Sequence, residues 1–293
     1  MRSLAVARTA RGSSEVPMSV DTNDDTSDVS GGRVPPLPPL PPRTKAGRGR
    51  LGSVLSGLAV AVGCVLFLGG FVVAAVLYQP FSVPSDSMTP TLDVGSKVLA
   101  QRVDGADVKR GDIVVFQDPL WGDVTMVKRV VAVGGDTVAC CGADGRLTLN
   151  GTPVDEPYLP AGKPASGQKF SVTVPAGNLF LLGDERHTSM DSRAHLQEAG
   201  RGSVPRSAVV ARVDAVAWPA KGVVERPAPF AALPGGISRP GPIALLFFAI
   251  VAGCVLILGG AAYGPVARAL GRKASAGQQV SAGQQARPGQ KAS

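Results

Sequence analysis

Two serines, Ser85 and Ser87, stand two positions apart in the segment 84–92. In an extended chain alternate side chains point the same way, so one face carries both hydroxyls while Asp86 and Met88 lie on the other. A serine hydroxyl becomes a nucleophile when a neighbouring base takes its proton. The spacing therefore indicates acyl-transfer chemistry, provided that the fold brings a base to this face.

The first candidate base is Lys128, in the Val-rich stretch 124–133. Strand alternation places Lys128 beside Met126 and Val130, and puts Arg129 on the opposite face. An amine among apolar neighbours loses the hydration of its charged form, so its pKa falls and a neutral, proton-accepting fraction appears. The alternative is a solvated edge strand, which the composition of the Lys-Arg pair by itself favours.

Two histidines, His187 and His195, offer other chemistry. Either histidine, together with Asp184 or Asp191, would complete a formal Ser-His-Asp triad with Ser87. The same loop also suggests a metal site, although two histidines with acids and no cysteine form a weak ligand pattern. The simplest interpretation is a polar loop held by Asp-Arg pairs, and the residue types alone leave these alternatives open.

Short Val-rich segments separated by Gly, Pro and Asp predict β-strands, with no amphipathic helix longer than two turns between them. The predicted strands are 97–102, 112–117, 124–133, 170–174, 178–182 and 208–218. Asn150 and Gly151 follow a short apolar segment and are typical of a tight hairpin turn. The fold class is therefore mostly β, as an antiparallel domain that is barrel-like or sandwiched.

Two long runs without charged residues, 54–78 and 243–263, are each long enough to cross a hydrocarbon core of about 30 Å as a helix. Basic residues flank their outer ends, so the positive-inside rule places both tails in the cytoplasm. The segment 79–242 carries 17 basic and 17 acidic residues, so the net charge of +8 belongs to the tails. This distribution predicts contact with anionic membrane lipid and no nucleic-acid partner.

These features divide the chain into six parts. They are a disordered Pro-rich cytoplasmic tail (1–53), a transmembrane helix (54–78), an extracytoplasmic domain (79–220), a linker (221–242), a second transmembrane helix (243–263) and a disordered cytoplasmic tail (264–293). Cys64 and Cys254 fall in the spans and are predicted to be packing thiols. Cys140 and Cys141 are adjacent in the outward domain, where thiols can oxidise. We favour two separate thiols, because a vicinal disulfide would force an unusual peptide geometry.

Four segments, in this order, resemble the motif boxes of type I signal peptidase, the bacterial leader peptidase family with a Ser-Lys dyad. They are 84–92, 110–116, 128–136 and 183–193. Residues 150–151 and 156–159 fall where that family has similar residues, so the resemblance covers about residues 80–218. The second span near the C-terminus resembles the arrangement in some actinobacterial members.

The resemblance implies a role for each matching residue. Ser87 aligns with the nucleophile and Lys128 with its general base. Ser85 aligns with a hydroxyl that stabilises the oxyanion together with the Ser87 backbone N–H. Ser189 aligns with the hydroxyl that orients the lysine amine. Three residues align with a polar cluster that supports this loop, namely Arg186, Asp191 and Arg193.

The implied reaction is hydrolysis of secreted preproteins after small side chains, typically Ala-x-Ala, through an acyl-enzyme and without metal or cofactor. Residues 81–84 would pair with the substrate as an added strand. The chain departs from the family at Asp86, where a small residue is usual, and at His187. If Asp86 faces the hydroxyls, its charge raises the pKa of the lysine. The alternatives are a related Ser-Lys protease with one dedicated substrate and an inactive, membrane-tethered β domain.

Overall fold

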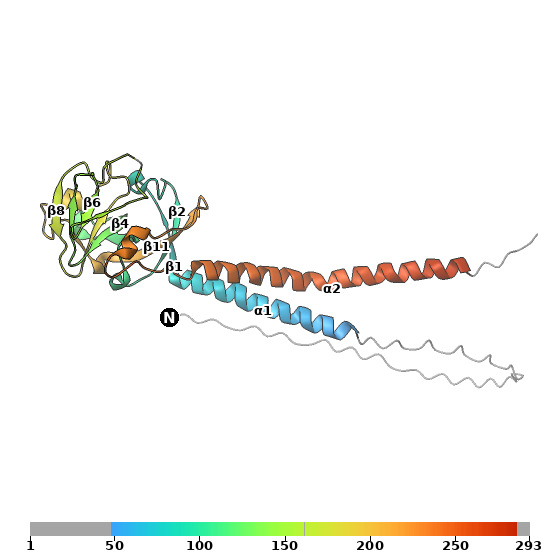
Figure 1. Cartoon of the computed structure of the whole chain (residues 1–293). Coiled ribbons are helices and arrows are strands. Elements are labelled where there is room, and N and C mark those ends of the chain that lie inside the picture. The colour runs from blue at the N-terminus through green and yellow to red at the C-terminus, as the bar shows by residue number, and fades with distance from the viewer. Residues whose placement is uncertain (1–47, 161, 286–293) are drawn as a thin grey trace, which may run out of the picture. The chain divides into compact units, whose positions relative to one another are not determined.

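Short strands make up most of the chain between two long helices (Figure 1). The computed structural model describes residues 48–160 and 162–285. The larger sheet has the strand order β1-β2-β11-β3-β4-β9-β10, with β12 paired to β11, and the smaller sheet has the order β7-β6-β5-β8. All of these pairs are antiparallel. The prediction of a mostly β, antiparallel domain is confirmed.

Six strands follow the predicted segments to within one residue at each end, and the other six were not predicted. The larger sheet contains β1 (Tyr78–Ser82), β2 (Lys97–Gln101), β3 (Ile113–Gln117), β4 (Thr125–Val133), β9 (Asn178–Leu182), β10 (Val204–Pro205), β11 (Val209–Trp218) and β12 (Gly222–Val223). The smaller sheet contains β5 (Thr137–Cys140), β6 (Leu147–Leu149), β7 (Thr152–Val154) and β8 (Phe170–Thr173). Asn150 and Gly151 have φ values of 53° and 81° between β6 and β7, as a primed hairpin turn requires.

Single turns of 3-10 helix connect several strands. They are η1 (Asp86–Met88), η2 (Gly105–Asp107), η3 (Pro119–Trp121), η4 (Ser192–His195), η5 (Arg206–Ala208) and η6 (Ala228–Ala232). Asp104, Asp118 and Asp191 cap three of these turns by accepting a hydrogen bond from a backbone N–H two residues further on. Short side-chain oxygens suit this position, because the first N–H groups of a helical turn have no backbone partner.

Strand β4 lies in the interior of the larger sheet and carries both Lys128 and Arg129. The register pairs Lys128 with Val114 of β3 and Arg129 with Leu182 of β9. Both residues are buried, at 5% and 1% exposure. The alternative of a solvated edge strand is therefore wrong, because β4 has a hydrogen-bonded strand on each side and core residues against both faces.

Helices α1 (Arg48–Leu77) and α2 (Ile243–Gln285) contain two segments long and apolar enough to cross a membrane, Gly52–Leu77 and Ile243–Val266. The two helices lie side by side along these segments (Figure 1). Glycines permit the close approach, since a Cβ added at Gly253 would lie 2.6 Å from the Phe67 backbone nitrogen. The Ser56 hydroxyl donates to the Gly260 carbonyl at 2.7 Å.

Helix α2 continues past residue 263, where the sequence predicts a disordered tail. Ala and Gln, which favour helix, are the commonest of the helix-forming residues in 264–285, and the helix continues there despite Pro265 and four glycines. The remainder of that predicted tail, 286–293, and the predicted Pro-rich tail up to residue 47 lie outside the described residues.

The segment 221–242 packs onto the domain, so the linker predicted there is wrong. Phe230 is fully buried in the core beside the smaller sheet, and Arg226 forms ion pairs with Asp112 and Asp214. Asp214 also accepts hydrogen bonds from the Tyr78 hydroxyl at 3.1 Å and the Gly241 N–H at 2.9 Å. Residues next to both long helices therefore meet at one buried carboxylate. Pro and Gly interrupt any periodic pattern in this segment. The sequence therefore gives no pattern from which its burial could be predicted.

The cysteines of the domain differ from the sequence prediction. Cys140 and Cys141 form a disulfide with a Cα–Cα separation of 2.9 Å, the spacing of a cis peptide. The prediction of separate thiols assumed the usual trans geometry, which keeps neighbouring sulfur atoms apart. Cys64 and Cys254, in the long helices, are free thiols.

Candidate active site

Ser87 lies at the centre of the turn η1, where Ser87 and Met88 are buried. Ser85 is extended, with φ −134° and ψ 165°, and residues 86–88 then form a turn of 3-10 helix. The extended conformation predicted for this segment is therefore wrong at residues 86–88, and the chain is extended again at Thr89. The turn still brings the Ser85 hydroxyl, as donor, to 3.2 Å from the Ser87 Oγ. The two hydroxyls are neighbours because of the turn, and not because of strand alternation.

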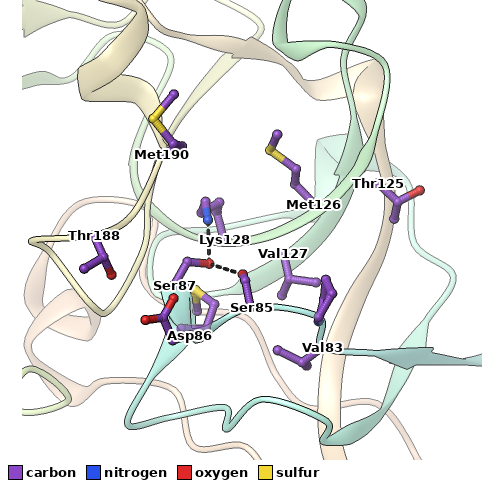
Figure 2. A pocket seen from close by; sticks show the side chains of 12 residues that line it. Val83, Ser85, Asp86, Ser87, Thr125, Met126, Val127, Lys128, Thr188 and Met190 are labelled. Atoms are coloured by element: carbon purple, nitrogen blue, oxygen red, sulfur yellow. Dashed lines mark hydrogen bonds between the residues drawn. The ribbon is translucent and has the colours of Figure 1, made fainter.

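Lys128 reaches Ser87 from β4. Its Nζ lies 2.7 Å from the Ser87 Oγ, and both side chains point into the same cleft (Figure 2). Ser87 is 8% exposed and Lys128 5% exposed. The contact joins residues 41 positions apart in the chain. A nucleophile and a base at this distance can exchange a proton directly.

Burial tunes the Lys128 amine. Loss of hydration lowers its pKa from 10.5 to about 8, and this effect outweighs the charges of Asp191, Asp184 and Asp86, which raise it. At neutral pH about a tenth of such an amine is unprotonated. The predicted fall of the Lys128 pKa on burial is confirmed. The Asp86 carboxylate opposes this fall, as expected for a negative charge near the hydroxyls.

The loop after β9 is tied to the nucleophile turn through its backbone. The Glu185 N–H donates to the Ser87 carbonyl at 3.1 Å, and a Cβ added at Gly183 would lie 2.5 Å from that carbonyl oxygen. Asp191 accepts a hydrogen bond from the Gly183 N–H at 3.0 Å and forms an ion pair with Arg193 at 2.7 Å. Only glycine fits at residue 183, and the buried Asp191 carboxylate holds the loop in place.

Two further buried ion pairs support the site, and sequence analysis missed their partners. Arg186 pairs with Glu156 at 2.6 Å. Arg129 pairs with Asp184 at 2.7 Å, and the Thr91 hydroxyl donates to the same carboxylate at 2.5 Å. Burial forces such pairing, because an unpaired charge inside the domain would cost several kcal/mol. The sequence shows only an arginine inside an apolar strand. Such an arginine needs a carboxylate partner in the fold, but the sequence does not identify that partner.

Ser189 lies against Gly183, on the loop that faces Lys128. Its hydroxyl oxygen is buried and has no hydrogen-bond partner among residues 48–160 and 162–285. The contact by which Ser189 would orient the lysine amine is thus not formed in this structure. That role stays a prediction.

The two histidines lie apart from the Ser87–Lys128 contact. His195 stacks on Trp121 with ring centroids 4.5 Å apart, and its Nδ1 is 2.8 Å from a Glu198 carboxylate oxygen. His187 is exposed. The carboxylates proposed as their partners are occupied, since Asp184 binds Arg129 and Asp191 binds Arg193. The fold thus places Lys128, and not a histidine, beside the serine.

A cleft of about 260 Å³ opens in front of the two hydroxyls. Its lining residues are Val83, Pro84, Ser85, Asp86, Ser87, Met88, Thr125, Met126, Val127, Lys128, Thr188 and Met190. Figure 2 shows Val83, Met126 and Val127 to the right of the Ser87 side chain and Asp86 and Thr188 to its left. Ser85 and Thr125 also lie on the right, and the apolar Met190 lies on the left with Asp86, so the clearest difference between the two sides is the Asp86 carboxylate.

The family model described as signal peptidase, peptidase S26, matches residues 54–218. The chain belongs to this family. Signal peptidase I of Mycobacterium tuberculosis (strain H37Rv) is 32% identical over 207 residues, covering 50% of this chain and 70% of the relative. Signal peptidase I of Bacillus licheniformis is 37% identical over 145 residues, covering 46% and 75%. A crystal structure of a signal peptidase I from Enterococcus faecalis is 27% identical and covers 40% of this chain and 96% of its own, with a TM-score of 0.29.

Membership in the signal peptidase family makes this chain a serine peptidase. The matched range contains helix α1 from residue 54 onward, the nucleophile turn, β4 and the loop after β9. Helix α2 and the segment that leads into it lie beyond the match. Two candidate membrane helices thus flank the peptidase domain, and the second is not part of the shared family region.

Proposed function

We propose that this chain is a membrane-bound endopeptidase that removes N-terminal signal peptides from secreted preproteins with Ser87 as nucleophile and Lys128 as general base. The observation that carries the proposal is the 2.7 Å contact between two buried side chains, one a hydroxyl and the other an amine whose pKa is lowered to about 8. Burial supplies the neutral amine that a serine nucleophile needs at physiological pH.

The reaction proceeds in two halves. Neutral Lys128 takes the Ser87 proton while the Oγ attacks the scissile carbonyl carbon, and the C–N bond breaks as Lys128 gives that proton to the leaving amine. A water then attacks the acyl-enzyme ester as Lys128 accepts its proton. The C–Oγ bond to Ser87 breaks, Lys128 returns the proton to the Ser87 oxygen, and the signal peptide leaves with a new carboxylate. The oxyanion of each half lies between the Ser85 hydroxyl and the Ser87 backbone N–H. We assign to Ser189 the orientation of the amine during the reaction, a contact that the structure does not contain, and to Arg186, Asp191 and Arg193 the support of its loop.

Substrate size follows from the cleft. A volume of about 260 Å³ with apolar side chains on one half favours small residues before the cut, of the Ala-x-Ala type. Strand β1 pairs with β2 on one edge and with no other strand in the described part of the chain. Its second edge offers backbone groups to an extended substrate, and β1 leads directly into Val83 and the nucleophile turn.

The same proposal assigns a topology in the cell membrane. Both spans cross the bilayer, both tails are cytoplasmic, and the domain faces outward in contact with lipid. The contacts Gly63 to Gly253 and Ser56 to Gly260 run antiparallel, as required of a chain that leaves the bilayer and re-enters it from the same side. The position of β1 directly after α1 keeps Ser87 close to the surface where a signal peptide emerges.

The test is cleavage of an Ala-x-Ala preprotein by the full chain in detergent micelles. Ser87→Ala and Lys128→Ala should each lower kcat/KM by about a thousandfold or more, because the nucleophile and its base act as a unit. The matched controls are Ser171→Ala and Lys169→Ala, which change exposed residues of the same types. Activity should rise with pH through an apparent pKa of about 8. Retained cleavage in either site variant would refute the dyad.

A further inference from the structure

Asp86 is an unpaired carboxylate in the cleft. The cleft lining contains two charged residues, Asp86 and Lys128. Lys128 is buried, whereas Asp86 is exposed and lies directly between the two serines in sequence. Within residues 48–160 and 162–285, its carboxylate makes no hydrogen bond and no ion pair. A substrate side chain in the cleft therefore meets this charge without a competing protein partner.

The charges nearby do not neutralise Asp86. The carboxylates of Asp184 and Asp191 are each paired with a buried arginine, and Glu185 lies 3.4 Å from the amine of Lys163. Lys128 must be unprotonated to act as a base, so the competent form of the enzyme has no cation in its cleft. In that form the cleft carries one formal negative charge, located at Asp86.

The position of Asp86 indicates which part of a substrate it meets. Figure 2 shows Asp86 with Thr188 on the side of Ser87 opposite to Val83 and Val127. Small apolar residues before the cut suit the side lined by Val83 and Val127. The residues after the cut, which begin the mature protein, then extend over the side that carries the Asp86 carboxylate. An extended substrate places successive residues only about 3.3 Å apart, so the first two lie within reach of the carboxylate.

We propose that Asp86 is a specificity-determining residue that favours preproteins with a lysine or arginine in the first two positions after the cut and disfavours aspartate and glutamate there. The inference rests on the proposed function and adds a substrate class to it. The proposal also explains why an unfavourable charge is present beside the base. The Asp86 charge raises the pKa of Lys128 and so reduces the fraction of neutral amine. A neutral residue at this position would serve proton transfer better, which suggests that the charge acts on the substrate.

The experiment compares three preproteins that differ only in the first residue after an Ala-x-Ala site, which is Lys, Gln or Glu. With the full chain in neutral detergent at low salt, kcat/KM should fall from Lys to Gln to Glu by about threefold at each step, the effect of one exposed charge pair. Asp86→Asn should bring the three values together, and Asp86→Lys should reverse their order. Salt near 1 M should shrink the differences of the unmodified enzyme, because it screens exposed charges.

Asp155→Asn is the matched control, because Asp155 is exposed and lies outside this cleft. It changes the net charge equally and should keep the full preference. Equal cleavage of all three preproteins by the unmodified enzyme would overturn the inference while leaving the peptidase function intact. A preference that persists in Asp86→Asn would also overturn it. Failure to cleave even the Gln preprotein would instead count against the proposed function.

Discussion

Replacing Lys128 by methionine should abolish cleavage and at the same time stabilise the domain at neutral pH. Methionine has a similar length and no charge, so it can fill the buried position of Lys128 but needs no hydration. In the unmodified protein, protonated Lys128 is unfavourable inside the fold, and this is why its pKa is lowered from 10.5 to about 8. The catalytic base is thus expected to reduce stability.

The magnitude follows from the two pKa values. A fall from 10.5 to about 8 corresponds to about 3 kcal/mol, and the buried position of Lys128 means that solvent screens little of it. Below pH 8 the lysine is protonated in both the folded and the unfolded state, and the whole penalty applies. Between pH 8 and 10.5 only the unfolded state still binds the proton, so the penalty diminishes as pH rises. Above 10.5 it is absent.

The assay is thermal unfolding of the full chain in detergent at pH 7, 9 and 10.5, comparing Lys128→Met with the unmodified protein. At pH 7 the variant should unfold about 6–12 °C higher, and the difference should shrink towards zero at pH 10.5. Exposed Lys169→Met is the control and should show no pH-dependent difference. Every other titrating group is common to the compared proteins and cancels.

A difference that does not change with pH would refute the reasoning, because it would mean that packing and not charge separates the two proteins. A variant that is less stable at pH 7 than the unmodified protein would show that the ammonium is stabilised in the fold. Either result would remove the physical basis for a neutral lysine as the base.

Three other predictions concern contacts outside the dyad. Asp184→Asn leaves the buried Arg129 guanidinium without its carboxylate and should lower the free energy of unfolding by about 3–5 kcal/mol in denaturant titrations, whereas a double change to Arg129→Met and Asp184→Leu should cost less. Gly241→Ala places a Cβ 2.6 Å from the Asp214 carboxylate and should lower the free energy of unfolding by about 1–3 kcal/mol. Gly167 has open space around it, so Gly167→Ala should have little effect. Equal losses of stability in the two variants would refute the close packing at Asp214. Gly253→Leu should separate α1 from α2. It should abolish cross-linking between cysteines introduced at Val60 and Ile257 in a protein that lacks Cys64 and Cys254. Gly259 faces open space, so Gly259→Leu should preserve the cross-link.

Local patterns in the sequence were sufficient for six of the twelve strands that the structure describes and for the two long helices. Alternating or continuous apolar residues between Gly, Pro and Asp located β2, β3, β4, β8, β9 and β11, because the side-chain period of a strand is a local property. Asn150 and Gly151 located a hairpin for the same reason. The order and spacing of four short segments indicated the family, which the match over 54–218 bears out.

Other features depend on contacts that no local pattern encodes. The 3-10 turn at Ser87 is held by a hydrogen bond from the Glu185 N–H, about a hundred residues further along the chain. Residues 221–242 have the composition of a linker, but Phe230 finds a place in the core and Arg226 finds two carboxylates. The disulfide of Cys140 and Cys141 depends on a backbone geometry at one peptide bond. In each case the local structure depends on the group that the residue meets in the fold, and not on the residue type alone.

By itself, the sequence determined that this protein is mostly β between two membrane-length helices. Periodicity and residue type suffice for this, because hydrophobic burial and hydrocarbon thickness act on consecutive residues. The pairing of Ser87 with Lys128 was implied by the resemblance to a family, since residue types alone left a histidine base equally open. Only the tertiary structure decided that β4 is a central strand, that Lys128 is dehydrated, and that its amine lies 2.7 Å from the serine hydroxyl. The physical reason is that a pKa is set by everything packed around the amine. The charged groups that act on Lys128 come from the turn η1, the loop after β9 and the turn η4, which meet only when the chain folds.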